Sequence, residues 1–242
     1  AHPNGDGTVA SGAYKGMKLS ELWEKHPELF GDTGMDRFPL LVKIIDAKDD
    51  LSIQVHPDDA YAKAHENGSL GKTECWFILD CKENATLVVG HNAKTKEELE
   101  QMIHEGRWKE FIREIPIKPG DFIQIDPGTV HAIKGGTLLL ETQQSSDITY
   151  RVYDYDRLSN GKPRQLHIVQ SIDVITVPAK SADNSVVHIE KKDDAIQQLI
   201  QCPYYTVYRI DVEHRVETWQ DKPFVLMSVV EGEGTLNGTP LK

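Results

Sequence analysis

Short stretches in which apolar and polar residues alternate occur along most of the chain, and residues 51–56 give the clearest example. In an extended segment, successive side chains point to opposite faces. One face here is apolar and consists of Leu51, Ile53 and Val55. The other face is polar and consists of Ser52, Gln54 and His56. The pattern predicts a strand whose polar face meets either water or a binding site.

Further stretches with strand character follow at short intervals, separated by turns rich in glycine and proline. They are residues 38–46, 74–79, 85–90, 115–117, 121–125, 131–133, 137–142, 148–153, 172–177, 204–212 and 224–231. The run at 38–46 is almost continuously apolar, which predicts a strand buried on both faces. Many short strands with few helices predict a mainly β fold, either a β-sandwich or a barrel.

Three segments have helical character. Ser20 can cap a short helix at 21–26, which Pro27 interrupts. Residues 58–65 follow Pro57 and begin with two acidic residues, which indicates a short helix. Further along, Thr95 and Glu98 form a capping box, and the apolar residues behind them keep helical spacing. We expect this third helix to pack on the outside of the sheet, without a part in the chemistry.

Composition narrows the class of protein. The 242 residues carry 38 acidic and 27 basic side chains, for a formal net charge of -11. This charge argues against a binder of nucleic acid or of membrane surfaces, whereas a small anionic substrate can still bind where Lys and Arg gather locally. The three cysteines form no CxxC pair, and no apolar run reaches the length of a membrane helix. We therefore expect a cytoplasmic protein.

Three polar residues at strand ends indicate a metal site. His56 and Glu74 each lie at the edge of a predicted strand, and His131 follows the Pro127-Gly128 turn. Together with the neutral amide of Gln54, they would give a compact nitrogen and oxygen site for a divalent metal. Such a set suits zinc, and it also suits a two-histidine, one-carboxylate iron site, so ligand type leaves the metal open.

The segment from Gly120 to His131 has the shape of the second cupin motif, which is a glycine, a strand, a Pro/Gly turn and a ligand histidine. One residue usually separates the proline and the glycine in that motif, whereas they are adjacent here. Four motifs together resemble a more specific family, type I mannose-6-phosphate isomerase (phosphomannose isomerase) in its short bacterial form. They are Ser52-Ile53-Gln54-Val55-His56-Pro57, Gly71-Lys72-Thr73-Glu74-Cys75-Trp76, Pro127-Gly128-Thr129-Val130-His131-Ala132 and Thr149-Tyr150-Arg151-Val152-Tyr153-Asp154-Tyr155.

The resemblance implies a cupin jelly-roll β-sandwich with a few peripheral helices and the start of a second jelly-roll unit. The expected domains are a metal-binding catalytic domain at 1-178 and an incomplete second cupin-like domain at 179-242. The implied reaction is the zinc-dependent interconversion of mannose 6-phosphate and fructose 6-phosphate through an enediol. A small-molecule sugar phosphate is the expected partner.

The resemblance also assigns residues. It implies that one Zn²⁺ per chain is held by the metal ligands His56, Glu74, His131 and Gln54. Arg151 and Lys72 fall on active-site positions of the family, where we expect them to act in catalysis and to bind substrate. Ser52 matches a serine of the substrate pocket.

Some questions remain open at this level. The general base is Glu141, Asp154 or a hydroxide on the metal, and the sequence does not choose among them. The same ligand set fits an iron-dependent cupin dioxygenase, and a non-catalytic cupin that binds sugar phosphate is a further alternative. Seven further histidines are expected on the surface or in hydrogen bonds; they are His26, His65, His91, His104, His167, His188 and His214.

Overall fold

The computed structural model describes residues 6–182 and 185–241. The chain divides into two compact units, which are treated separately below. One unit consists of Pro39–Glu213, and the other combines Ala1–Phe38 with His214–Lys242.

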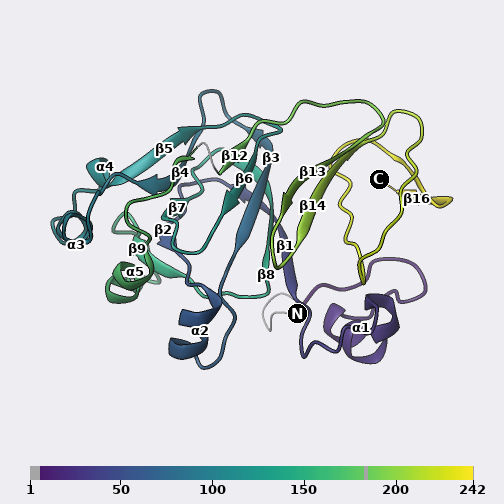
Figure 1. Ribbon diagram of the computed structural model, residues 1–242, viewed down its shortest axis with the longest axis horizontal. Helices are drawn as coiled ribbons and strands as arrows, with labels where there is room; N and C mark the ends of the chain where they lie inside the picture. Colours follow the sequence, from purple (N-terminus) through teal and green to yellow (C-terminus); the bar gives the residue numbers. More distant parts are fainter. Residues whose placement is uncertain (1–5, 183–184, 242) are drawn as a thin grey trace. The chain divides into compact units, whose positions relative to one another are not determined.

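The larger unit is a sandwich of two five-stranded antiparallel sheets (Figure 1). The first sheet has the order β1-β8-β3-β6-β12, with β1 Leu40–Ala47, β8 Thr137–Gln144, β3 Glu74–Cys81, β6 Phe122–Ile125 and β12 Val186–Val187. The second has the order β5-β4-β7-β2-β9, with β5 Ile112–Pro116, β4 Thr86–His91, β7 His131–Ala132, β2 Ile53–Val55 and β9 Tyr150–Tyr153. This is the mainly β cupin jelly roll that the sequence predicts.

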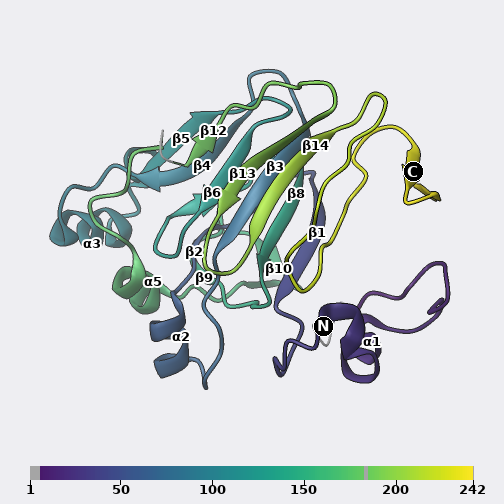
Figure 2. The same cartoon turned by 45° about the vertical axis from the view of Figure 1, so that its right-hand side comes forward.

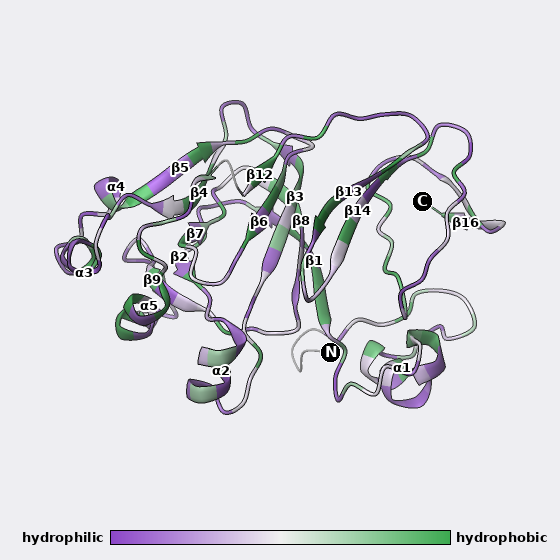
Figure 3. Cartoon of the chain, in the orientation of Figure 1, coloured by the Kyte–Doolittle hydropathy of each residue, from purple (hydrophilic) through white to green (hydrophobic). Residues whose placement is uncertain are grey.

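Alternation along the strands fills the space between the sheets. Trp76, Ile78 and Leu139 from the first sheet pack against Leu87 and Val89 from the second, and all five are fully buried. Burial of a large apolar side chain contributes about 1.5–3 kcal/mol, so this layer is the main source of stability for the sandwich. Figure 3 shows the apolar character of β6.

Helices cover the outer face of the second sheet. They are α2 Asp59–His65, α3 Lys96–His104, α4 Trp108–Phe111 and α5 Ile168–Val174. Leu99 and Phe111 from α3 and α4 contact Ile53 and Val55 of β2 in one apolar cluster. Thr95 caps α3 by accepting a hydrogen bond from the backbone of Glu98, as the capping box predicts. Because Ile53 and Val55 face these helices, Gln54 points the opposite way, into the sandwich.

A two-stranded hairpin covers the outer face of the first sheet. It consists of β13 Ala195–Gln201 and β14 Thr206–Asp211, and Figure 2 shows it beside β3. Tyr205, in the hairpin turn, is buried with Cys75 and Phe122. A small hairpin follows β9 in the sequence and consists of β10 Leu158–Ser159 and β11 Lys162–Pro163.

The smaller unit contains α1 Leu19–Lys25, the 3₁₀ turn Pro27–Phe30, and a hairpin of β15 Gly234–Leu236 and β16 Thr239–Leu241. An aromatic cluster holds its two chain segments together. Trp23, Phe30 and Phe38 surround Phe224, with ring centroids 5.5–6.4 Å from that of Phe224.

Three expectations about elements are wrong. Residues 172–174 are the end of helix α5, and neither 175–177 nor 224–231 forms a strand. The strand at 38–46 lies at the sheet edge as β1, where Ile44 is 70% exposed, so it is not buried on both faces. The division into domains 1-178 and 179-242 stays a prediction; compactness groups hairpin β13–β14 with the sandwich.

Candidate metal centre

Strands of both sheets bring the three ligand candidates together. His56 directly follows β2, His131 begins β7 and Glu74 begins β3. One nitrogen or oxygen atom from each residue lies within 4.8 Å of the others. All three side chains are buried, with exposed fractions of 1%, 0% and 0% for His56, Glu74 and His131. This is the His-Glu-His cluster that the sequence predicts.

Backbone carbonyls orient both imidazoles. His56 Nδ1 donates to the carbonyl oxygen of Ile148 at 2.8 Å, and His131 Nδ1 donates to that of Thr129 at 2.9 Å. Each Nδ1 therefore carries the proton of the neutral ring, which leaves a lone pair on Nε2. Metal-binding histidines are held in the same way in many proteins. Both lone pairs point toward Glu74, whose oxygens lie 3.4 Å from His56 Nε2 and 3.3 Å from His131 Nε2.

The cluster fits a divalent metal ion. Both carboxylate oxygens of Glu74 are buried; within the described part of the chain Oε2 forms an ion pair with Lys72, and Oε1 accepts no hydrogen bond. A buried carboxylate with free oxygens is costly unless a cation or donors compensate it. Two imidazole lone pairs and a carboxylate are the ligand types that zinc and related metals prefer. His56, Glu74 and His131 can therefore hold such an ion.

Lys72 supplies the positive charge nearest to the cluster. Its Nζ lies 2.6 Å from Glu74 Oε2 and 3.0 Å from His56 Nε2. Burial alone raises the pKa of Glu74, but Lys72 and the two imidazoles outweigh it and hold that pKa well below its ordinary value. Burial and Lys72 lower the pKa of His56 to about 3. The imidazole is thus neutral at physiological pH, as a metal ligand must be.

Gln54 lies beside the cluster on the inner face of β2. It pairs with His131 across the strands, and its Nε2 lies 3.2 Å from His131 Nε2. Rotating the amide by half a turn exchanges its nitrogen and oxygen, so the side chain can also present an acceptor to a cation. Ser52, on the same face by alternation, is buried at the start of this strand.

Arg151 faces the same side of the second sheet because it pairs with Gln54 in the neighbouring strand β9. Its Nη1 donates to the carbonyl oxygen of Gln165 at 2.9 Å, while its buried Nε has no hydrogen-bond partner among residues 6–182 and 185–241. Burial and the nearby cations Arg164 and Arg157 lower the pKa of Arg151.

The two carboxylates considered as bases differ in their surroundings. Glu141 is buried, and Lys43 Nζ donates to it at 2.6 Å. Burial and the charge of Glu74 raise the pKa of Glu141. Sequence reasoning missed Lys43, although alternation in β1 places it opposite Glu141 on the inner face.

Asp154 is held in an ion-pair network instead. Arg164 Nε and Nη2 donate to its two oxygens at 2.7 and 2.5 Å, and Arg157 Nη2 donates to Oδ1 at 2.5 Å. These bonds lower the pKa of Asp154. A carboxylate with both oxygens occupied by cations is a poor proton acceptor.

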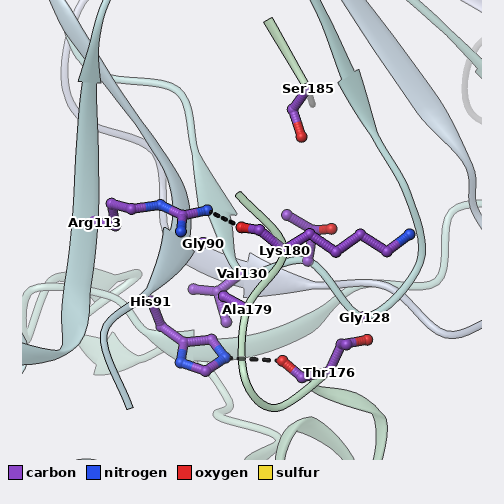
Figure 4. A pocket seen from close by; sticks show the side chains of 10 residues that line it. Gly90, His91, Arg113, Gly128, Val130, Thr176, Ala179, Lys180 and Ser185 are labelled. Atoms are coloured by element: carbon purple, nitrogen blue, oxygen red, sulfur yellow. Dashed lines mark hydrogen bonds between the residues drawn. The ribbon is translucent and has the colours of Figure 1, made fainter. Parts of the chain in front are cut away.

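A second concave site lies elsewhere in the sandwich, around His91 (Figure 4). It is about 10 Å³ in volume, which is room for about one water molecule. His91 Nε2 donates to the carbonyl oxygen of Thr176 at 3.0 Å, and Arg113 donates to that of Lys180 at 2.6 Å. No carboxylate lines this cavity, so its described residues offer no comparable metal site.

The described residues contain no helix long and apolar enough to cross a membrane.

The fold and the buried ligand cluster define the class, which is a cupin. Comparisons with known proteins identify its family. Residues 1–78 match the family model of the phosphomannose isomerase type I catalytic domain, and residues 195–240 match that of the mannose-6-phosphate isomerase cupin domain. The mannose-6-phosphate isomerase ManA of Bacillus subtilis is 54% identical over 98% of this chain and 75% of its own length. The chain therefore belongs to the type I phosphomannose isomerase family of enzymes.

Other relatives agree. The mannose-6-phosphate isomerase of Streptococcus mutans is 49% identical over 98% of this chain and 74% of its own length. The crystal structure of the mannose 6-phosphate isomerase from Bacillus subtilis has a TM-score of 0.82 at 50% identity, covering 92% of this chain and 71% of that chain. A phosphomannose isomerase from Salmonella typhimurium, at 16% identity and a TM-score of 0.64 over 79% of this chain and 68% of that chain, shares the fold.

Proposed function

We propose that this chain interconverts mannose 6-phosphate and fructose 6-phosphate, with one Zn²⁺ held by His56, Glu74, His131 and Gln54. The observation that carries the proposal is the buried carboxylate of Glu74, whose oxygens lie 3.4 Å from His56 Nε2 and 3.3 Å from His131 Nε2. Membership of the isomerase family supports the substrate. A bound zinc ion would polarise the sugar oxygens and stabilise negative charge on them.

The reaction moves a proton between C1 and C2 of the open-chain sugar through an enediol, so it needs a base for the carbon acid. Glu141 is our choice. Its burial raises its pKa, which makes the carboxylate a stronger proton acceptor than an exposed one. Lys43 holds the carboxylate in place. The arginine network around Asp154 argues against the other carboxylate.

Positive side chains would stabilise the charge that develops during the reaction. Lys72 lies 2.6 Å from Glu74 and is buried, so its ammonium acts at low dielectric, where a charge contact is stronger than in water. Arg151 has a buried Nε that no described residue hydrogen-bonds. A forked guanidinium suits phosphate or a developing oxyanion, and we assign it to substrate binding together with Ser52 and Lys72.

The direct test couples fructose 6-phosphate formation to a colour reaction. Mannose 6-phosphate is supplied to the enzyme as purified, to enzyme treated with a chelator, and to treated enzyme supplemented with Zn²⁺. We expect activity, loss of activity and recovery, respectively. Turnover that persists after complete metal removal, or oxygen consumption in place of isomerisation, would overturn the proposal.

We also propose that residues 179-242 begin a second cupin-like domain and that the protein acts in the cytoplasm. The match of residues 195–240 to a cupin-domain model supports the first point. The absence of paired cysteine motifs supports the second.

A further inference from the structure

The connection from α2 to strand β3 has no regular secondary structure, and its buried end carries Lys72. Gly71, Lys72 and Thr73 belong to no helix or strand, yet all three are buried. Irregular buried backbone needs hydrogen-bond partners from elsewhere, because water does not reach it. The groups that supply these bonds therefore set where Lys72 lies and where Glu74 begins.

Asp59, at the start of α2, binds this segment. Its Oδ1 accepts a hydrogen bond from the backbone of Gly71 at 2.8 Å and another from Gln144 Nε2 at 3.1 Å. Gln144 in turn accepts from the backbone of Thr73 at 2.8 Å. Asp59 is thus bonded directly to one end of the segment and through Gln144 to the other end.

The contact between Gly71 and α2 is close as well as hydrogen-bonded. A Cβ atom at Gly71 would lie 2.4 Å from the carbonyl carbon of Asp58, and 2.5 Å from the backbone nitrogen of Asp59. Only glycine fits this approach. In addition, the backbone of Lys72 donates to the carbonyl oxygen of Pro57 at 3.0 Å, which joins the segment to the chain next to His56.

The outer hairpin reaches the same aspartate. Tyr204, in the turn between β13 and β14, donates from its hydroxyl to Asp59 Oδ2 at 2.8 Å. Burial and the bond to Asp59 raise the pKa of Tyr204 to about 12, so the hydroxyl keeps the proton that it donates. Its neighbour Tyr205 is buried against Cys75 of β3, which fixes the turn on the sheet.

We propose that Asp59 and Tyr204 are positioning residues for the metal centre. Asp59 fixes the segment that carries Lys72 and Glu74, and Tyr204 fixes Asp59 from the hairpin turn. Neither residue is one of the proposed metal ligands or substrate-binding residues. The inference rests on the proposed metal site, and its test uses metal affinity, so it can stand even if the isomerase reaction proves wrong.

The test measures Zn²⁺ affinity of the full chain by competition with a chromophoric chelator, alongside thermal unfolding. Loss of such supporting partners typically weakens metal binding about 10- to 100-fold, and we expect this for Asp59→Ala. Asp59→Asn keeps an oxygen for Gly71 and Gln144, so we expect it to recover most of the affinity. Tyr204→Phe removes one of the three hydrogen bonds to Asp59 and should weaken Zn²⁺ binding by a smaller factor than Asp59→Ala.

Tyr61→Phe is the matched control, because Tyr61 also donates to an aspartate, Asp173, but from the other side of α2. A merely structural role would lower the unfolding temperature without changing the zinc affinity of the folded protein. If Asp59→Ala binds zinc like the wild type, the proposal is wrong. If that variant does not fold, Tyr204→Phe decides: an affinity equal to that of Tyr61→Phe overturns the proposal, and a weaker one supports it.

Discussion

The sandwich contains two sites built around buried histidines, and they differ in what surrounds the rings. Burial lowers the pKa of the imidazole both at His131, in the metal cluster, and at His91, beside the small cavity. Each ring has one nitrogen bonded to a backbone carbonyl and a lone pair on the other. At His131 the lone pair faces a carboxylate and lies near a second imidazole.

At His91 the surroundings are less suited to a cation. The ring stacks on Phe111, and the positive charges of Arg113 and Lys94 contribute to its lowered pKa. A metal ion would meet repulsion there and a single nitrogen ligand. A buried histidine is therefore not a metal ligand by itself; several ligand atoms, including those of a carboxylate, must converge at one place.

Removing the charge of Glu74 tests this difference most strongly. We expect the Glu74→Gln variant to bind Zn²⁺ no longer stably. Its kcat/KM should fall about 10,000-fold, because several kcal/mol of charge stabilisation by the metal are lost. Metal analysis after dialysis and the coupled assay measure the two losses. Zinc retention equal to that of the wild type would remove the distinction between the two histidine sites.

Glu141→Gln separates the base from the ligands. We expect kcat to fall about 1,000-fold, within the range that a general base contributes, while Zn²⁺ affinity changes little. Asp154→Asn is the matched carboxylate control, and we expect it to lower kcat by a much smaller factor. The opposite order of the two variants in steady-state kinetics would assign the proton transfer to Asp154.

Lys72→Met tests the cation beside the cluster. We expect kcat/KM to fall about 100-fold, as when one charge-stabilising donor is removed from an active site. Zinc affinity should hold or rise, because the ammonium 2.6 Å from Glu74 no longer repels the metal ion. Weaker zinc binding in this variant, measured by chelator competition, would mean that Lys72 helps to build the site.

His91→Leu is expected to have the smallest effect on function. Loss of the bond to Thr176 should cost about 1–3 kcal/mol in the free energy of unfolding, with unchanged zinc affinity and kcat. The pH dependence has a defined sign. Because burial lowers the pKa of His91 from 6.5, the unfolded chain binds its proton first as the pH falls, and the folded state loses stability.

The variant should therefore lose less stability than the wild type between about pH 7 and pH 5. Urea unfolding at both pH values measures this change. An equal loss in the two proteins would show that His91 does not titrate differently on folding.

Sequence predicts those parts of the site whose positions depend on residues close together in the chain. Alternation in β2 separates Gln54 from Ile53 and Val55, and the motifs give His56, Glu74 and His131. Lys43 was missed because its contact with Glu141 joins residues 98 positions apart and depends on the pairing of β1 with β8.

Local pattern also failed where an apolar run is short. The apolar pattern of residues 172–177 suits a strand and a buried helix equally well. Residues 172–174 are helical because α5 packs against β9 and β2. The strand expected at 224–231 is absent, and side chains there such as Val225 and Val230 remain about half exposed, at 47% and 55%. A segment with an alternating pattern forms a stable strand only where a neighbouring strand can pair with it.

The most direct test of the central claim is an X-ray absorption spectrum at the zinc edge of the dialysed wild-type protein. The account predicts about one zinc per chain with nitrogen and oxygen ligands only, and with the multiple-scattering signal of two imidazoles. A sulfur ligand, or the absence of imidazole scattering, would contradict a site formed by His56, Glu74 and His131.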